Sequence, residues 1–235
     1  MTFLILMALF LTALALFVVW RNLRKARRAE FIRTYPLPAG LFDRLRKQRP
    51  ELGLKDCQLV SQALRQFFMA HLKSGCKFVS MPSQVADDLW HEFILYTKNY
   101  DLFCKQAFGG FLHHSPAVVL STAQQNNTGL RRCWWHTCRE ENINPRDPTR
   151  LPLLFALDAK LKVADGFHYV ADCHSVHRKS SKGDTSGAVY CGGDFSSSSF
   201  DGGTDGFGDA SSADGGGSGD SGSGCGGGGC GGGGD

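Results

Sequence analysis

Four side chains between residues 87 and 114 are of the types that bind metal ions. Asp87 and His91 lie four residues apart, so they share one face of any helix that contains both. His113 and His114 follow after the glycines that end this helix, and the turn can bring an imidazole back toward His91. Imidazole nitrogens and carboxylate oxygens are ligands of zinc and of other divalent transition metals. The pattern predicts a site made of His91, one of the two later histidines, and an aspartate.

A second interpretation of the same residues needs no metal. Asp88 lies three residues before His91, and either aspartate can orient the imidazole by a hydrogen bond within a packed helical core. Trp90 belongs to the same short motif. The segment His-Glu-Phe-Ile-Leu lacks the second histidine of a zinc-protease helix, and the body of the chain contains no phosphate-binding glycine loop and no nucleophile-elbow serine. We therefore favour a protein that is not an enzyme, with a metal-dependent hydrolase as the alternative.

Three other cysteine-containing segments have weaker patterns. Residues 133–138, Cys-Trp-Trp-His-Thr-Cys, match no zinc spacing, and we expect buried thiols beside aromatic rings there. Residues 173–177, Cys-His-Ser-Val-His, can chelate a metal adventitiously. Cys225 and Cys230 are each followed by four glycines, and we expect them to be reduced and idle. The chain has nine cysteines at scattered spacings, which favours free thiols that pack as small hydrophobes over a disulfide framework.

Apolar residues recur at spacings of three and four along most of the body, which predicts a mainly α-helical bundle. The expected helices cover residues 41–47, 54–73, 81–109, 121–141 and 153–161. The third of these carries a stripe at spacings of 4, 3, 4 and 3, made of Leu89, Phe93, Tyr96, Tyr100 and Phe103. We expect this helix to lie centrally in the bundle. A proline-rich loop at 142–152 and a short extended segment at 167–170 complete the pattern.

The N-terminal segment has the length and composition of a transmembrane helix. Residues 2–20 carry no charge, and 19 residues at about 1.5 Å each span about 28 Å, close to the hydrocarbon thickness of a bilayer. A basic cluster follows, made of Arg21, Arg24, Lys25, Arg27 and Arg28. Signal peptides carry their charge before a shorter apolar core, so we expect a retained anchor. The positive-inside rule then places the N-terminus outside the cell and the body in the cytoplasm.

The chain is expected to have four parts: a transmembrane helix at 1–20, a basic connector at 21–37, a helical domain at 38–178 and a disordered tail at 179–235. Residues 192–235 contain 20 glycines, and their few apolar side chains cannot offset the entropy lost on ordering. They also contain seven of the 22 acidic residues and no lysine or arginine. Residues 1–191 therefore have a net charge of +11, from 26 basic and 15 acidic residues. We expect the basic cluster to contact anionic lipid headgroups, the domain to bind an unidentified protein, and no nucleic acid to bind.

Two motifs resemble a known family. They are the run Asp-Asp-Leu-Trp-His-Glu-Phe-Ile-Leu-Tyr-Thr-Lys-Asn-Tyr at 87–100 and Phe-Leu-His-His-Ser-Pro at 111–116, extended by Cys-Arg-Glu-Glu at 138–141 and Leu-Pro-Leu-Leu-Phe-Ala-Leu-Asp at 151–158. Together with the tail they resemble bacterial glycine-rich domain-containing proteins, which combine a helical body with a Gly/Cys-rich C-terminus. The resemblance implies the architecture and directs attention to Asp87, Trp90, His91, His113 and His114, and it implies no reaction.

Overall fold

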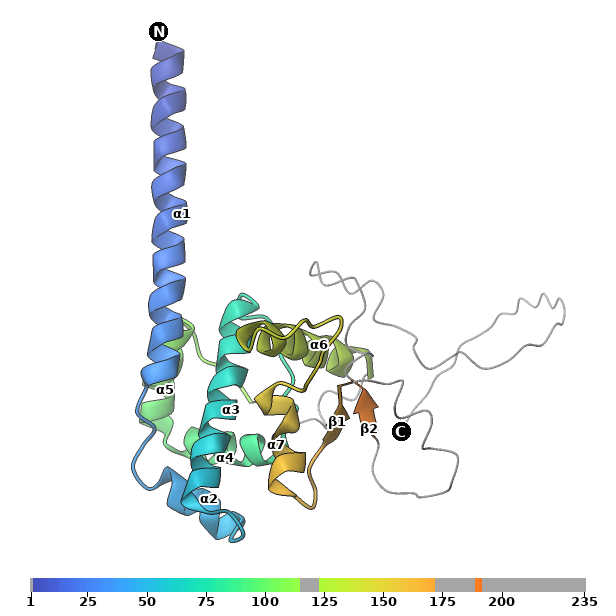
Figure 1. Cartoon of the computed structure of the whole chain (residues 1–235). Helices are drawn as coiled ribbons and strands as arrows, with labels where there is room; N and C mark the ends of the chain where they lie inside the picture. The colour runs from blue at the N-terminus through green and yellow to red at the C-terminus, as the bar shows by residue number, and fades with distance from the viewer. Residues whose placement is uncertain (1, 115–122, 172–188, 192–235) are drawn as a thin grey trace, which may run out of the picture.

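The structure is a computed structural model that describes residues 2–114, 123–171 and 189–191. The described residues are mainly α-helical, as predicted, and Figure 1 shows one long helix projecting from a small helical bundle. The elements are α1 (Thr2–Thr34), α2 (Leu41–Gln48), α3 (Leu54–Lys73), α4 (Gln84–Leu95), α5 (Thr97–Ala107), α6 (Ala123–Glu140), α7 (Leu153–Leu161), β1 (His168–Val170) and β2 (Val189–Cys191).

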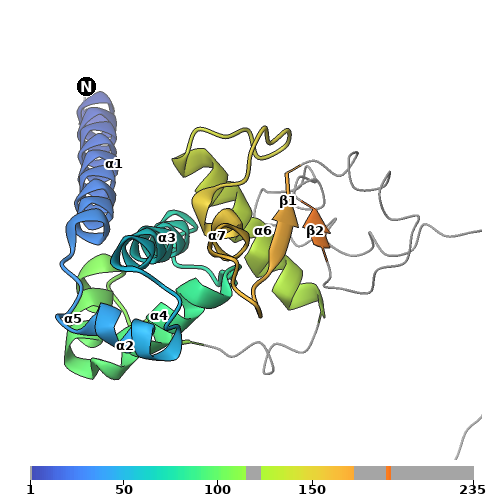
Figure 2. The same cartoon turned by 60° about the horizontal axis from the view of Figure 1, so that its bottom comes forward.

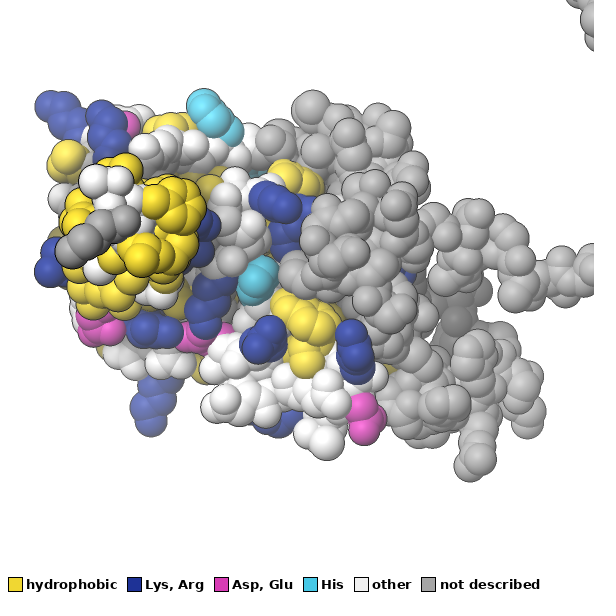
Figure 3. Space-filling model, turned by 90° about the horizontal axis from the view of Figure 1, so that it is seen from above, with side chains coloured by type: hydrophobic (Ala, Val, Ile, Leu, Met, Phe, Trp, Pro, Cys, Tyr) yellow, Lys and Arg dark blue, Asp and Glu magenta, His cyan; other side chains and the backbone are white. Residues whose placement is uncertain are grey.

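The apolar half of α1 makes no contact that buries it. Residues 2–23 are all exposed, and the helix is long and apolar enough to cross a membrane. Seen along α1 from the N-terminal end, hydrophobic side chains cover the helix, and lysine and arginine side chains surround it (Figure 3). Length and composition suit a membrane anchor and a signal sequence alike.

The second half of α1 is part of the folded domain. A basic connector was predicted at residues 21–37, and the helix continues through most of that range without a break, to Thr34. Ile32 is fully buried. The Arg65 guanidinium of α3 donates to the carbonyl oxygens of Ile32 (3.1 Å) and Tyr35 (2.9 Å), which have no partner inside the helix. These tertiary contacts hold the last turn helical until Pro36 follows.

α3 is the central helix of the bundle and contacts α1, α2, α4, α6 and α7. Figure 2 shows it between α1 on one side and α6 and α7 on the other. Its bounds match the prediction because both ends are marked in the sequence. At the start, the Asp56 carboxylate accepts the backbone N–H of Gly53 (2.9 Å). At the end, Gly75 adopts a left-handed conformation with φ of 76°.

The single helix predicted over residues 81–109 is wrong, because the chain breaks at Tyr96 into α4 and α5. The Tyr96 backbone leaves the helical region (φ −80°, ψ 60°), while its hydroxyl donates to the carbonyl of Ala39 (3.2 Å). The change of direction lets Phe93 of α4 pack against Tyr100 and Phe103 of α5, with ring centroids 5.2 and 5.4 Å apart. Tertiary packing thus overrides a continuous helical periodicity.

The C-terminal part of the domain follows the remaining predictions with one correction. α6, α7 and the extended segment at 167–170 lie where they were expected. β1 pairs in parallel with β2, with Tyr169 opposite Tyr190. β2 falls inside the range predicted to be disordered, so that prediction is wrong at 189–191, where the branched and aromatic residues Val189 and Tyr190 favour a strand. The glycine-rich segment from residue 192 lies outside the described residues.

Candidate metal centre

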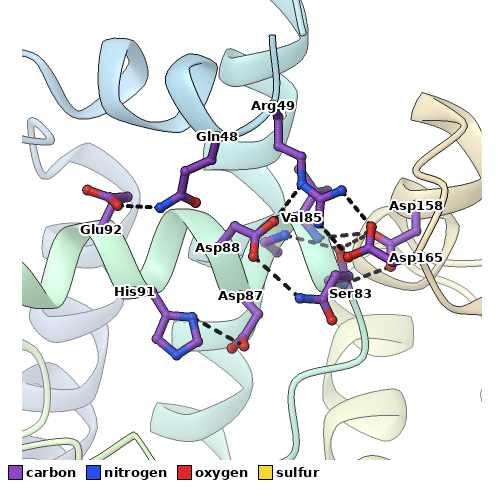
Figure 4. A network of polar contacts seen from close by, with 12 residues as sticks. Gln48, Arg49, Ser83, Val85, Asp87, Asp88, His91, Glu92, Asp158 and Asp165 are labelled. Carbon is purple, nitrogen blue, oxygen red and sulfur yellow. Dashed lines mark hydrogen bonds and ion pairs between the residues drawn. The ribbon is translucent and has the colours of Figure 1, made fainter. Parts of the chain in front are cut away.

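A buried carboxylate of α7 holds the N-terminus of α4. Asp158 is only 1% exposed, and it accepts hydrogen bonds from the backbone N–H groups of Gln84 (2.7 Å) and Val85 (3.3 Å). Two more come from the Ser83 hydroxyl (2.7 Å) and the N–H of Phe167 (2.9 Å). The first N–H groups of a helix lack internal partners, and the helix dipole favours a negative charge beside them. Asp158 therefore fixes where α4 begins (Figure 4).

Asp87 lies in the first turn of α4 and its carboxylate contacts two imidazoles. One oxygen is 3.5 Å from Nδ1 of His91, and the other is 3.1 Å from Nε2 of His114. Figure 4 shows the His91 ring directed at Asp87. The rings of His91 and His114 have centroids 4.1 Å apart. One ligand atom from each of the three residues lies within 4.8 Å of the others, so the structure brings together three of the four predicted ligands.

His114 is positioned by contacts on both sides of the chain segment that carries it. The buried Tyr100 hydroxyl donates to the carbonyl of Leu112 (2.6 Å) and accepts the indole N–H of Trp90 (3.1 Å). Burial raises the pKa of Tyr100, so the hydroxyl remains a donor. The Trp90 ring also packs edge-on against the His114 ring, with centroids 4.7 Å apart. Trp90, a predicted site residue, therefore helps to position His114.

His113 points away from this group. Its ring is exposed and packs against Phe111, with centroids 4.8 Å apart, and it is outside the set of convergent ligand atoms. The two neighbouring histidines thus occupy different surroundings: His114 is mostly buried, with 15% of its side chain exposed, and His113 faces solvent. His113 is the natural control for every test of His114.

Asp88 is engaged elsewhere. Arg49 donates to its carboxylate (2.8 Å) and makes two further bonds to Asp165 (2.5 and 2.8 Å). The amide of Gln84 lies 3.4 Å from the other Asp88 oxygen. The hydrogen bonds that Arg49 donates to Asp165 and to Asp88 raise its pKa, so this cation is fixed in the network. Of the two adjacent aspartates, only Asp87 faces the histidines.

The group of Asp87, His91 and His114 (the Asp/His cluster) offers one oxygen and two nitrogen donors. Donor atoms around a tetrahedral zinc ion lie about 3.4 Å apart, given bonds of about 2.0–2.1 Å. The contacts of 3.1 and 3.5 Å involve different oxygens of Asp87, and one donor atom from each residue lies within 4.8 Å of the others, so small side-chain shifts would bring them to that spacing. The His91 side chain is 49% exposed, so solvent reaches the cluster and can occupy a fourth position. Three protein ligands with an open position are typical of catalytic rather than structural zinc sites.

Comparison with known proteins gives a family and no relative of established function. Residues 27–195 match the UCP032817-like family. The chain belongs to this family. The match begins inside the basic part of α1 and covers every element of the domain, including the Asp/His cluster. The UCP032817-like family is uncharacterized, and no curated protein and no solved structure matches the chain. The finer resemblance to glycine-rich domain-containing proteins stays a prediction.

The thiols of the described part behave as predicted for small hydrophobes. Cys57, Cys104, Cys133 and Cys138 are buried and free, and Cys76 is exposed. Burial raises the pKa of Cys138 to about 12 and that of Cys133 further, which leaves both thiols protonated and poor as ligands. The segment 173–177 and the two tail cysteines lie outside the described residues.

The residues that position the cluster were not identified from the sequence. Asp158 had a detectable signal, since it is the only acidic residue within the apolar segment Leu153–Leu161. Tyr100 was assigned to a packing stripe, and nothing in its spacing reveals that its hydroxyl joins Trp90 to Leu112. Arg49 lies 39 residues from Asp88 and 116 from Asp165, so its pairing depends on the complete fold.

Proposed function

We propose that the protein is a membrane-anchored helical module that binds a divalent transition metal ion, such as Zn²⁺, through Asp87, His91 and His114. The observation that carries the proposal is the convergence of three ligand atoms within 4.8 Å, on residues 27 positions apart in sequence. Two of these side chains are positioned by neighbouring residues. Asp158 holds the start of α4, which carries Asp87, and the Trp90–Tyr100 pair lies beside His114. Such outer contacts orient ligands in metal sites.

The anchor is the second part of the proposal. α1 is exposed and apolar over residues 2–20, and its basic half is built into the domain by Ile32 and Arg65. Cleavage after residue 20 would leave a charged helical stub at the edge of the bundle. Retention explains the single continuous helix better. The positive-inside rule then supports an N-terminus outside and a domain in the cytoplasm.

The metal proposal is tested on the full chain, purified in detergent and stripped of metal. Titration with Co²⁺ follows the d–d absorption, which distinguishes nitrogen and oxygen ligation from thiolate ligation by the cysteines. His91→Ala and His114→Ala are each expected to weaken binding at least about tenfold. His113→Ala removes a neighbouring histidine without touching the cluster, and it is expected to bind as the wild type does.

Equal binding by all four proteins would refute the cluster as the site, and so would an equal loss in His113→Ala. Thiolate charge-transfer bands that survive in His91→Ala would assign the metal to cysteines instead. The intact mass of the membrane-purified chain tests the anchor separately, because a cleaved leader removes about 20 residues. For orientation, Cys76 should react with an impermeant maleimide in inverted vesicles and be protected in intact cells.

A metal-dependent hydrolase is the second candidate, supported by the exposure of His91 and the open position that it leaves. A metal ion in such a site lowers the pKa of a bound water and supplies a hydroxide nucleophile. Without metal, the domain would be a binding or scaffolding module for an unidentified protein, the interpretation first favoured from the sequence. The Co²⁺ titration separates the hydrolase from the scaffolding module, because the scaffolding module has no specific metal site.

A further inference from the structure

A pocket lies between the basic half of α1 and the C-terminal end of α5. Its volume is about 340 Å³, at the lower end of the range for small-molecule sites, and its lining residues are Arg24, Arg27, Arg28, Phe31, Lys105 and Gln106. We propose that this pocket binds the phosphate of an anionic glycerophospholipid headgroup. The proposal rests on the membrane anchor proposed above and is independent of the metal site.

The charge of the pocket is the first argument. Arg24, Arg27 and Arg28 lie at positions i, i+3 and i+4 of one helix, where like charges repel one another. Within the described residues, no carboxylate forms an ion pair with any of the three. The Lys105 ammonium adds a fourth cation, shared with Asp101 at 2.6 Å. An anion in the pocket would offset the repulsion, and guanidinium groups are suited to two-pronged recognition of phosphate.

The depth of the pocket below the apolar segment is the second argument. At about 1.5 Å per residue, Arg24 lies about 6 Å beyond Trp20 along α1, and Arg28 about 12 Å beyond it. The headgroup layer extends about 5–7 Å beyond the hydrocarbon on each side of a bilayer. Arg24 therefore lies at the level of the lipid phosphates, and the long side chains of the next turn reach back toward that level. Lysines and arginines surround α1 on this face (Figure 3).

The rigidity of the pocket is the third argument. Phe31, which lines the pocket, packs on Phe103 of α5 with ring centroids 5.8 Å apart, and Tyr35 packs on the same ring at 4.9 Å. The Arg28 guanidinium lies against Gly109, two residues beyond the end of α5, so closely that a Cβ atom there would collide with it. α1 and α5 thus hold fixed positions relative to each other, so the cationic groups form a preorganised site and not merely a flexible basic tail.

The test compares lipids retained by the full chain in neutral detergent, using native mass spectrometry with equimolar phosphatidylglycerol and phosphatidylcholine. The pocket variant is Arg27→Gln with Lys105→Gln. The control variant, Lys47→Gln with Lys98→Gln, removes the same charge at exposed positions outside the pocket and outside the basic cluster. Each cation near an anionic surface contributes about fivefold to binding. Two such losses multiply, so the ratio of phosphatidylglycerol to phosphatidylcholine is expected to fall about 25-fold in the pocket variant and less than about twofold in the control.

Equal falls in the two variants would overturn the pocket in favour of general attraction to basic residues, and no preference in the wild type would overturn it outright. Displacement of the retained lipid by millimolar inorganic phosphate, lost in the pocket variant, would reassign the site to a free phosphate ligand. The intact mass in the same spectra shows whether residues 1–20 remain attached. A cleaved chain would refute the anchor, and an intact chain without lipid preference would refute only the pocket.

Discussion

Replacing Asp158 by asparagine keeps the size of the side chain and removes its charge at a point where four donors converge. One carboxylate oxygen accepts from the Ser83 hydroxyl and the N–H of Val85, and the other accepts from the N–H groups of Gln84 and Phe167. If the asparagine amide nitrogen replaces the first oxygen, the Ser83 hydroxyl can rotate and accept a hydrogen bond from it, but the N–H of Val85 loses its acceptor. If the amide nitrogen replaces the second oxygen, the N–H groups of Gln84 and Phe167 both lose their acceptor.

The more favourable arrangement therefore loses one buried hydrogen bond, worth about 1–3 kcal/mol, and weakens the others because the acceptor is no longer charged. Loss of the charge beside the α4 N-terminus adds up to about 1 kcal/mol. Asp158→Asn is expected to lower the free energy of unfolding by about 2–4 kcal/mol, measured by urea unfolding of the full chain in detergent with tryptophan fluorescence.

Asp165→Asn is the matched control, because it removes an equal charge nearby from a side chain that is 57% exposed. Its expected cost is below about 1 kcal/mol, as for a surface ion pair. The argument for Asp158 fails if Asp158→Asn unfolds within about 0.5 kcal/mol of the wild type, or if it matches Asp165→Asn. In either case the four contacts do not hold the start of α4.

Two further predictions concern the helices around the site. Tyr100→Phe leaves the Trp90 indole N–H and the Leu112 carbonyl without their partner, so we expect a loss of about 2–3 kcal/mol in the free energy of unfolding and metal binding about tenfold weaker, whereas Tyr96→Phe should leave metal binding unchanged. Burial, with smaller contributions from neighbouring cations, lowers the pKa of His136 to about 4. The unfolded chain therefore binds the proton first, and the free energy of unfolding falls as the pH drops from about 6.5 toward 4. His136→Gln should remove about 1–2 kcal/mol of the fall between pH 7 and pH 5, seen in urea midpoints, and an unchanged fall would contradict the assignment.

The helices whose ends carry their own signals were predictable from the sequence. α3 and α7 have the predicted bounds, because Gly53 and Gly75 flank the apolar spacing of α3 and Pro152 precedes that of α7. The break at Tyr96 and the extension of α1 to Thr34 have no such signal. Each depends on a side chain from another helix or loop, through the hydroxyl bond to Ala39 and the guanidinium of Arg65. Local periodicity does not contain that information.

The candidate site divides in the same way. The pairing of Asp87 with His91 follows from helical spacing alone, and it was expected. The choice of His114 over His113 was left open, because it depends on how the segment after α5 is attached. The Tyr100 hydroxyl binds the carbonyl of Leu112, two residues before His114, and thereby sets which imidazole turns toward α4.

α5 connects the two proposed sites. Its last turns supply Lys105 and Gln106 to the pocket beside α1, and the chain that leaves it carries His114 into the Asp/His cluster. The ring of Phe103, in the middle of α5, packs against α1 through Phe31 and against α4 through Phe93. A displacement of α5 relative to α1 must therefore also displace it relative to α4. The same aromatic packing that holds the proposed headgroup pocket also holds the residues of the Asp/His cluster, so a single helix would relate the orientation of the proposed anchor to the geometry of the proposed metal site.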